Sequence, residues 1–375
     1  MKVLLDPTKI GPKAAFLETN LLRRLVGQDE AVRRIVGTYQ VYLAGLNAPG
    51  RPVGSFLFLG PTGCGKTRIV EALAETLLGD FRAMVKVDCG EFQHRHEIAK
   101  LVGSPPGYLG HRETHAALEQ EALNRHRTVE CQLSLVLFDE IEKASGAVWN
   151  LLLGILDKAT LTLGNNRRVT FSQSLIFMTS NLGARQIVAP ASNGMGFQQH
   201  PNSESSQMEV ERASNASIQA ARKNFAPEFM NRIDHVVAFS PLSRGELERV
   251  LDIEMQTVQQ RIIANPRGPA FRFTLSTRAR ELLLDTGADI RYGARHLKRA
   301  IERLLVHPLT NLVATRQVRA GDCVGIDHNP PSASLDFVLV SESPLLPVPV
   351  LNGSLLARPG SDLRSGWTRL FRPTG

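Results

Sequence analysis

The chain is poor in cysteine, and its few cysteines follow no recognisable spacing. Its 375 residues include only four of them, with no CxxC pair and no Cys/His pattern typical of a metal site. They are Cys64, Cys89, Cys131 and Cys323. This scarcity excludes a disulfide framework and a zinc-binding cysteine cluster. Scattered thiols are typical of a reducing compartment, so we expect a cytoplasmic protein.

Long apolar runs are also missing. Hydrophobic residues make up 43% of the chain, but they come in short runs, none of which is long enough to span a bilayer. The N-terminus carries a three-residue apolar patch before Asp6 and Pro7, which is too short for a secretory signal. We therefore expect neither a membrane-embedded protein nor a membrane partner.

A moderate excess of positive charge is present. Lysine and arginine number 44 against 36 aspartates and glutamates, which gives a formal net charge of +8 at pH 7. This balance favours anionic partners. It suits a nucleotide as well as a nucleic acid, so charge alone does not choose between them.

The stretch from Ser55 to Thr67, SFLFLGPTGCGKT, joins an apolar run, a glycine-rich turn and a helix-forming segment. It fits G-x-x-x-x-G-K-[ST] in the required strand, loop and helix setting. Glycines let backbone N–H groups surround a polyphosphate, and the helix N-terminus adds partial positive charge. The lysine reaches the outer phosphates, and the threonine hydroxyl can bind Mg²⁺. We predict a nucleoside triphosphate site made of Gly60, Pro61, Thr62, Gly63, Cys64, Gly65, Lys66 and Thr67; the alternative is a chance turn between a strand and a helix.

A second apolar run, residues 133–140, ends in the adjacent carboxylates Asp139 and Glu140. Its nearly continuous hydrophobicity predicts a strand buried on both faces of a parallel sheet. Ligands bind at the carboxyl ends of such strands. We predict that Asp139 holds Mg²⁺ and that Glu140 polarises the attacking water. Taken alone, the pair could equally be a helix-start signal.

Two further positions are candidates for contact with the nucleotide. The run 174–181, SLIFMTSN, predicts another strand, which ends in Asn181. That amide could orient the water, or it could simply favour a turn. Near Val26 a segment with apolar residues at helical spacing could pack over the adenine ring, or it could be an ordinary amphipathic helix.

The second half of the chain changes character twice. Residues 183–217 have a polar, low-complexity centre and are expected to be partly disordered. A helix carrying Arg232 and a strand over residues 236–239 should follow. From Ser243 the apolar residues recur at helical spacing, and beyond Asp327 the chain is rich in proline.

Seven stretches, in this order, resemble the Clp-type AAA+ unfoldases, and specifically the second ATPase module of ClpA, ClpB and ClpC. They are LVGQDEAV, GSFLFLGPTGCGKT, LVGSPPGYLG, FDEIEKA, IFMTSNLG, FAPEFMNRID and YGARHLKRAIER. The similarity covers roughly residues 22–327. It implies a P-loop α/β fold, with a parallel sheet flanked by helices and a smaller, mainly helical C-terminal domain.

The resemblance assigns roles residue by residue. Lys66 and Thr67 match Walker A, and Asp139 and Glu140 match Walker B. Asn181 matches sensor 1, Arg232 the arginine finger and Arg295 sensor 2, while Tyr108 with Leu109 matches the pore loop that grips a polypeptide. It also implies ATP, Mg²⁺, protein substrates and a ring, usually a hexamer, in which Arg232 acts on the neighbouring subunit's nucleotide. Without it, each arginine would be read as a solvated ion pair.

The chain departs from the family pattern in several places. His111 and Arg112 stand where acidic residues are typical, and the turn DKATLTLGNNRR lacks the family's Asp-Gly-Arg. Met195-Gly196-Phe197 matches the tripeptide with which ClpA-like and ClpC-like proteins dock on a barrel peptidase, although the surrounding loop is dissimilar. These departures leave the substrate preference and a peptidase partner open.

Together these observations predict four parts: residues 1–21, an ATPase domain 22–241, a small helical domain 242–328 and a flexible tail 329–375. We expect a ring-forming ATPase that unfolds or remodels proteins. The alternatives are a nucleic-acid motor or clamp-loader-like ATPase, motivated by the positive charge, and an assembly module that switches on ATP without threading a substrate.

Overall fold

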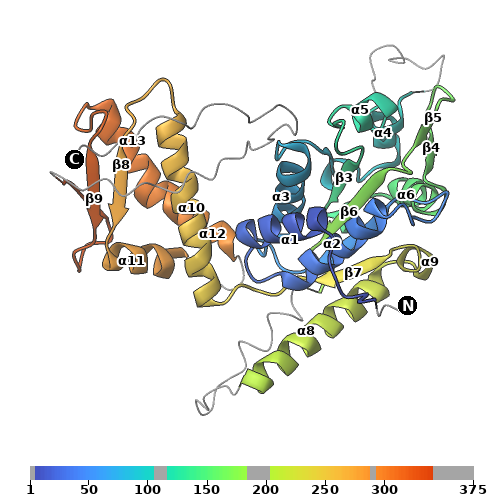
Figure 1. The fold of residues 1–375 in the computed structure, drawn as a ribbon, viewed down its shortest axis with the longest axis horizontal. Helices are drawn as coiled ribbons and strands as arrows, with labels where there is room; N and C mark the ends of the chain where they lie inside the picture. The colour runs from blue at the N-terminus through green and yellow to red at the C-terminus, as the bar shows by residue number, and fades with distance from the viewer. Residues whose placement is uncertain (1–4, 105–115, 184–202, 288–292, 341–375) are drawn as a thin grey trace, which may run out of the picture. The chain divides into compact units, whose positions relative to one another are not determined.

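The strand that leads into the phosphate loop lies inside a parallel sheet. In the computed structural model, β1 (Gly54–Leu59) pairs with β6 (Ser174–Ser180) on one side and with β7 (His235–Ala238) on the other. β3 (Ser134–Asp139) pairs with β6, and β2 (Val85–Asp88) pairs with β3, so the strand order is β2-β3-β6-β1-β7 (Figure 1). All four pairings are parallel. The predicted α/β fold is therefore confirmed.

The structure describes residues 5–104, 116–183, 203–287 and 293–340, and for residues 203–213 it describes the backbone alone. Three predicted features lie outside these ranges. They are the pore-loop pair Tyr108 and Leu109, the tripeptide Met195-Gly196-Phe197 and the tail from Pro344. In the part of the chain that is described, no helix combines the length and apolarity needed to cross a membrane.

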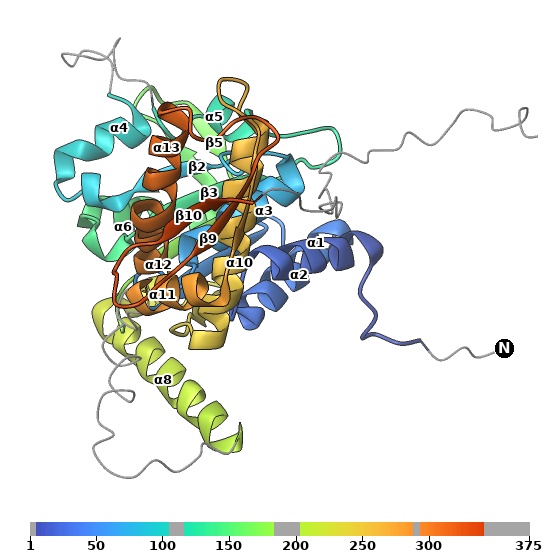
Figure 2. The same ribbon diagram turned by 90° about the vertical axis from the view of Figure 1, so that its left-hand side faces the viewer.

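Alternating side chains of the central strands cover the two faces of the sheet. On one face, Phe56, Phe58 and Phe177 pack among α1 (Pro12–Arg24), α2 (Asp29–Leu43) and α3 (Lys66–Leu78). On the other face, residues such as Leu57, Val136 and Phe138 pack against α6 (Gly146–Lys158) and the end of α8 (Ser203–Asn224). Figures 1 and 2 show α8 as one long helix. Burial on both faces explains the continuous apolar runs.

The first helix belongs to this core. Ala14, Leu17 and Leu21 on α1 are fully buried against α2 and α3. The boundary expected between residues 21 and 22 therefore falls inside a packed helix, because the apolar stripe of α1 begins before the similarity to the family does.

Several short elements connect the sheet to its helices. The stretch after β2 is broken into short turns rather than one helix, and residues 160–170 form a β-hairpin. These elements are η1 (Cys89–Glu91), η2 (Arg95–Ile98), α4 (Ala99–Val102), α5 (Gln120–Asn124), η3 (Ile141–Lys143), β4 (Thr160–Thr162), β5 (Arg168–Thr170) and α9 (Pro227–Met230).

Residues 242–340 have a hydrophobic cluster of their own, centred on buried leucines such as Leu251, Leu283 and Leu297. This region is mainly helical, as predicted, but it also contains a three-stranded sheet in the order β10-β9-β8. Its elements are α10 (Arg244–Ala264), β8 (Arg272–Leu275), α11 (Thr277–Gly287), α12 (Ala294–Ile301), η5 (Glu302–Val306), α13 (His307–Ala314), β9 (Cys323–Asp327) and β10 (Asp336–Leu339).

Two expectations about disorder can be compared with the structure. α8 begins at Ser203, inside the stretch expected to be partly disordered, because the residues after the polar centre include good helix formers and its end packs on the sheet. β10 pairs antiparallel with β9. Ordered chain therefore continues beyond residue 328, where the flexible tail was expected to start.

Candidate active site

The loop between β1 and α3 takes the sharp turn that its glycines allow. Gly60, Gly63 and Gly65 have φ values of 148°, 81° and 104°, a region that residues with a Cβ rarely adopt. A Cβ on Gly60 would lie 2.6 Å from the carbonyl oxygen of Phe239. The backbone can therefore curl back at the N-terminus of α3, where N–H groups are free to meet an anion.

Lys66 opens α3 and turns back into the loop. Its ammonium donates to the carbonyl oxygens of Gly60 (2.6 Å) and Pro61 (2.8 Å) and to Asn181 Oδ1 (3.0 Å). The side chain is only 8% exposed, and burial lowers its pKa. A poorly hydrated cation beside a ring of backbone groups is well placed to meet an anionic ligand.

The carboxyl end of β3 is organised by a threonine of the neighbouring strand. Thr179 Oγ1 donates to Asp139 Oδ1 (2.5 Å) and accepts from the backbone N–H of Glu140 (3.0 Å). Thr67 Oγ1 also points at Asp139 Oδ1, 3.4 Å away. One buried hydroxyl of β6 thus holds both predicted Walker B residues in place.

Glu140 and Asn181 are joined directly. Glu140 has a left-handed backbone (φ 55°), and its carboxylate accepts from Asn181 Nδ2 (3.3 Å) and pairs with Lys143. Since Asn181 Oδ1 accepts from Lys66, a single amide links the predicted Walker A lysine to the predicted catalytic carboxylate. Glu142 Oε1 holds the backbone N–H of Asn181 at 2.9 Å.

These groups line a cavity of about 310 Å³. One part is polar, with the phosphate loop, the two carboxylates and Asn181. The other part is apolar and receives Leu25 and Val26 from the segment before α2 together with Leu242, Val250 and Ile253 from the second half of the chain. Val26 therefore lies where contact with a base was expected. This division suits a nucleotide, whose base is apolar and whose phosphates are charged.

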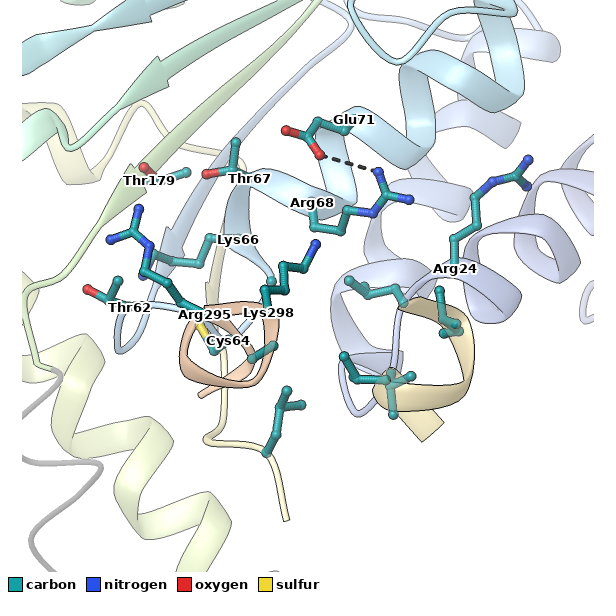
Figure 3. A pocket seen from close by; sticks show the side chains of 18 of the residues that line it. Arg24, Thr62, Cys64, Lys66, Thr67, Arg68, Glu71, Thr179, Arg295 and Lys298 are labelled. Atoms are coloured by element: carbon teal, nitrogen blue, oxygen red, sulfur yellow. Dashed lines mark hydrogen bonds and ion pairs between the residues drawn. The ribbon is translucent and has the colours of Figure 1, made fainter. Parts of the chain in front are cut away.

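Two basic residues of α12 complete the cavity lining. Arg295 and Lys298 both line it, and in Figure 3 their side chains point from α12 toward the phosphate loop. Lys298 pairs with Glu254 at 2.8 Å. The backbone N–H of Ala294 donates to the carbonyl oxygen of Gly63 (3.1 Å), so the start of α12 contacts the loop itself. Arg295 therefore lies at the cavity, and its role there stays a prediction.

The residues present fit a nucleotide with Mg²⁺. The turn of the loop needs glycine at residue 60, since a Cβ there would clash with the carbonyl oxygen of Phe239. Thr67 and Asp139 supply hard oxygen ligands, which Mg²⁺ prefers. Across the described residues, no three His, Cys, Asp or Glu side chains gather into a metal site.

Arg232 lies at the other end of the sheet. Its carbonyl accepts from Ser55 Oγ (3.4 Å) beside the start of β1, whereas the phosphate loop follows the end of β1. Six residues of strand separate these ends, about 20 Å at about 3.3 Å per residue. The guanidinium pairs with Asp157 of α6. Arg232 is therefore not part of this chain's own cavity.

The prediction that Arg232 lies on a helix is wrong. α9 ends at Met230, and Arg232 occupies the turn that follows. Ile233 is buried, and Asp234 Oδ2 accepts from Ser55 N (2.8 Å) and Oγ (2.7 Å). Because these contacts hold the chain in the extended path that leads into β7, α9 ends before another helical turn can form.

Sequence reasoning missed two organising residues. Gln28 is 5% exposed, and its amide donates to the carbonyl oxygens of Ser240 (3.0 Å) and Cys64 (3.3 Å). It thereby ties the segment before α2 to the loop. Thr179 was missed because a threonine inside an apolar strand looks like an ordinary strand former. Its position two residues before Asn181 was the available signal.

Comparison with known proteins agrees with this fold. A family model described as AAA domain (Cdc48 subfamily) matches residues 51–236, and one described as the C-terminal, D2-small domain of ClpB protein matches residues 242–326. Together the two models cover most of the chain.

Curated relatives are similar over 84% of the chain. The chaperone protein ClpB of Rhodopirellula baltica is 37% identical over 317 residues, which is 33% of its length. ClpB of Rhodopseudomonas palustris is 39% identical over 314 residues, also 33% of its length. The ATP-dependent Clp protease ATP-binding subunit ClpA homolog of Cyanidium caldarium is 36% identical over 315 residues, 35% of its length. The chain thus spans about a third of the length of these relatives.

Solved structures give the same result. A closed-state reconstruction of Hsp104 with ATPγS and FITC-casein matches 87% of this chain and 52% of that one, with a TM-score of 0.70 and 28% identity. An extended Hsp104–casein complex from S. cerevisiae matches 85% and 51%, with the same TM-score and identity. The fold and the site define an AAA+ ATPase. Within that class, the chain belongs to the Clp-type AAA+ family.

Proposed function

We propose that this chain is an ATP-hydrolysing protein unfoldase or remodeller that works as a ring of identical subunits, expected to be a hexamer. The observation that carries the proposal is the continuous link from Lys66 through Asn181 to Glu140 inside a cavity with a phosphate cradle. Support for a protein substrate comes from the relatives, which are named chaperones or a Clp protease subunit, and from structures of Hsp104 with casein.

The predicted site residues that line the cavity have proposed parts in ATP hydrolysis. Lys66 and the loop N–H groups bind the phosphates, and Thr67 and Asp139 would hold Mg²⁺, which supplies charge neutralisation at those phosphates. Glu140 polarises the attacking water, and Asn181 orients it. Val26 with the apolar lining receives the base.

Arg232 is proposed to act on the nucleotide of a neighbouring subunit. Its own cavity lies about 20 Å away along the sheet, and its guanidinium is 37% exposed with one carboxylate partner. A partly exposed arginine with its fork of N–H donors can serve a phosphate on another copy. Arg295 is proposed to sense the nucleotide from α12, and the turn of α12 into contact with Gly63 supports this.

Several finer points rest on the sequence alone. Tyr108 and Leu109 are proposed to grip the threaded polypeptide. The division between an ATPase domain and a small helical domain near residue 242 and a cytoplasmic location remain proposals of the same kind. No finding supports a barrel peptidase at Met195-Gly196-Phe197, and most of the relatives named above are chaperones. Peptidase docking is therefore not part of the proposed function.

The deciding experiment compares two candidate stimulants of ATP hydrolysis. An unstructured protein such as casein should stimulate ATP hydrolysis, and the chain with ATP should unfold a tagged model protein. Changing Tyr108 to Ala should abolish unfolding while leaving basal hydrolysis largely intact. Stimulation by DNA, with salt-sensitive DNA binding, would instead favour a nucleic-acid motor. ATP-dependent assembly without any unfolding would favour a switching module.

A further inference from the structure

Besides Thr179 and Thr67, the carboxylate of Asp139 has a third partner, the lysine Lys86 of β2. Lys86 Nζ lies 3.0 Å from Asp139 Oδ2, while Oδ1 is held by Thr179 and faces Thr67. Both carboxylate oxygens are therefore engaged, one by hydroxyls and the other by an ammonium.

The pairing of β2 with β3 explains how Lys86 reaches this carboxylate. Asp88 stands opposite Asp139 in the parallel ladder, and Lys86 stands opposite Leu137. Side chains at i and i+2 of a strand share a face, so Lys86 lies diagonally across from Asp139 on the face to which Leu137 belongs. Leu137 packs in the same cluster as Ile69 and Leu73 of α3. Lys86 thus approaches from the side of the sheet that carries α3 and Thr67.

The side chains of Lys86 and Asp139 differ in their solvent exposure and in how firmly they are held. The side chain of Lys86 is 49% exposed, whereas that of Asp139 is 19% exposed and is fixed by Thr179. An ion pair with one half-exposed, flexible lysine contributes little to stability. Lys86 can leave, and the carboxylate it leaves behind stays in place.

We propose that Lys86 is a positioning residue that supplies the counter-charge of Asp139 and opposes the binding of Mg²⁺ beside it. This inference rests on the proposed ATP and Mg²⁺ site. A cation within 3.0 Å of the metal-facing carboxylate reduces the negative charge that a second cation meets. Lys86 thereby sets the Mg²⁺ concentration at which this chain retains a nucleotide, so that the site loads only above a threshold.

The test measures binding of a fluorescent ATP analogue to the full chain across a series of free Mg²⁺ concentrations. Lys86→Met should lower the Mg²⁺ concentration at half-maximal binding by about 3- to 10-fold, the scale of an interaction between two charges about 4 Å apart that water screens fully. Lys86→Arg keeps the cation and should remain within about twofold of the unchanged chain. Lys100→Met removes an exposed lysine that does not line the cavity and is the matched control.

A second arm asks whether Lys86 acts through Asp139. In the Asp139→Asn background, Lys86→Met should shift the Mg²⁺ midpoint no further. If Lys86→Met lowers the melting temperature, the Lys86→Gln variant is used in its place. An unchanged midpoint in the methionine and glutamine variants, or an equal shift in the asparagine background, would overturn the inference while leaving the ATP site intact. Failure of the unsubstituted chain to bind the analogue in an Mg²⁺-dependent way would overturn the proposed site and this inference together.

Discussion

The two ends of the parallel sheet use the same device for different purposes. At the carboxyl end, the hydroxyl of Thr179 donates to Asp139 and accepts from the backbone N–H of Glu140. At the amino end, the hydroxyl of Ser55 donates to Asp234 (2.7 Å) and accepts from the backbone N–H of the same residue (2.9 Å). Both hydroxyls are buried, and each fixes a charged turn to a neighbouring strand.

The two ends differ in how many groups of a binding site they bring together. The carboxyl end encloses Lys66, two carboxylates and Asn181 in a cavity. The amino end presents Arg232, which is anchored by its backbone and has a side chain that is 37% exposed and pairs with Asp157. One end provides a nearly complete pocket, and the other presents a partly exposed cation. We infer that the two ends are complementary halves that meet only between copies.

The largest effect should come from removing the cation. Arg232→Ala should reduce ATP hydrolysis by roughly 10³–10⁵, the range reported for arginine fingers, while leaving nucleotide affinity in the chain's own cavity largely unchanged. Both quantities are measured on the same preparation, by phosphate release and by titration with a fluorescent nucleotide.

A mixing experiment decides whether Arg232 acts between copies. Chains with Arg232→Ala keep an intact cavity, and chains with Glu140→Gln keep an intact arginine. Mixed rings contain some interfaces with both, so the mixture should hydrolyse ATP faster than either variant alone. If mixing restores nothing, the complementarity of the two ends is contradicted.

The next effect concerns the carboxyl end alone. Glu140→Gln should slow hydrolysis by about 10²–10⁴, the usual contribution of a positioned base, while ATP binding persists because the phosphate cradle is untouched. Glu91→Gln, at an exposed acid outside the cavity lining, is the control. Turnover at the unsubstituted rate in the Glu140 variant would remove this residue from the proposed mechanism.

The hydroxyls of Thr179 and Ser55 allow a matched comparison, in which the expected effects are smaller than that of Glu140→Gln. Thr179→Val and Ser55→Ala should each destabilise the fold by about 1–3 kcal/mol, because each leaves a buried hydrogen-bonding group unpaired. Their kinetic effects should differ. Thr179→Val should slow hydrolysis at every protein concentration, since it disturbs both Walker B residues. Ser55→Ala should slow only the part of the rate that rises with protein concentration, since it disturbs the turn of Arg232.

The carboxyl end was predictable from sequence because its chemistry is local. A phosphate loop needs its glycines, lysine and threonine at fixed spacing along one stretch, from Gly60 to Thr67, and an apolar run marks the strand that precedes them. Asp139, Glu140 and Asn181 each end an apolar run, so parallel pairing brings them together. The structure places all of them around one cavity.

The amino end was less predictable because its conformation depends on long-range contacts. The helical reading of Arg232 failed since Ser55, almost two hundred positions away in the chain, captures Asp234 and ends the helix early. The roles of Lys86 and Thr179 beside Asp139 were not predicted from the sequence for the same reason. A lysine on a short strand and a threonine in an apolar one acquire meaning only when the strand order sets them beside Asp139.

The smallest expected effect is a pH dependence at the amino end. His235, the first residue of β7, stacks on Phe56 at 5.0 Å and has Nε2 3.2 Å from Thr38 Oγ1. Burial lowers the pKa of His235, and Arg34 lowers it further, whereas Asp234 opposes the shift. The neutral ring is therefore favoured in the folded chain. Its stabilisation is fully present above the unfolded pKa of about 6.5 and is lost as the pH falls from there toward the folded value.

Replacing His235 by Phe keeps the ring stacking and removes the titration. The melting temperature of the unsubstituted chain should fall more than that of His235→Phe between about pH 7.5 and about pH 5.5. Carboxylates that titrate in the same range affect both proteins equally, so only the difference is informative. Equal losses would mean that the start of β7 tolerates a charged ring, and that the amino end is less tightly packed than the carboxyl end with which it is compared.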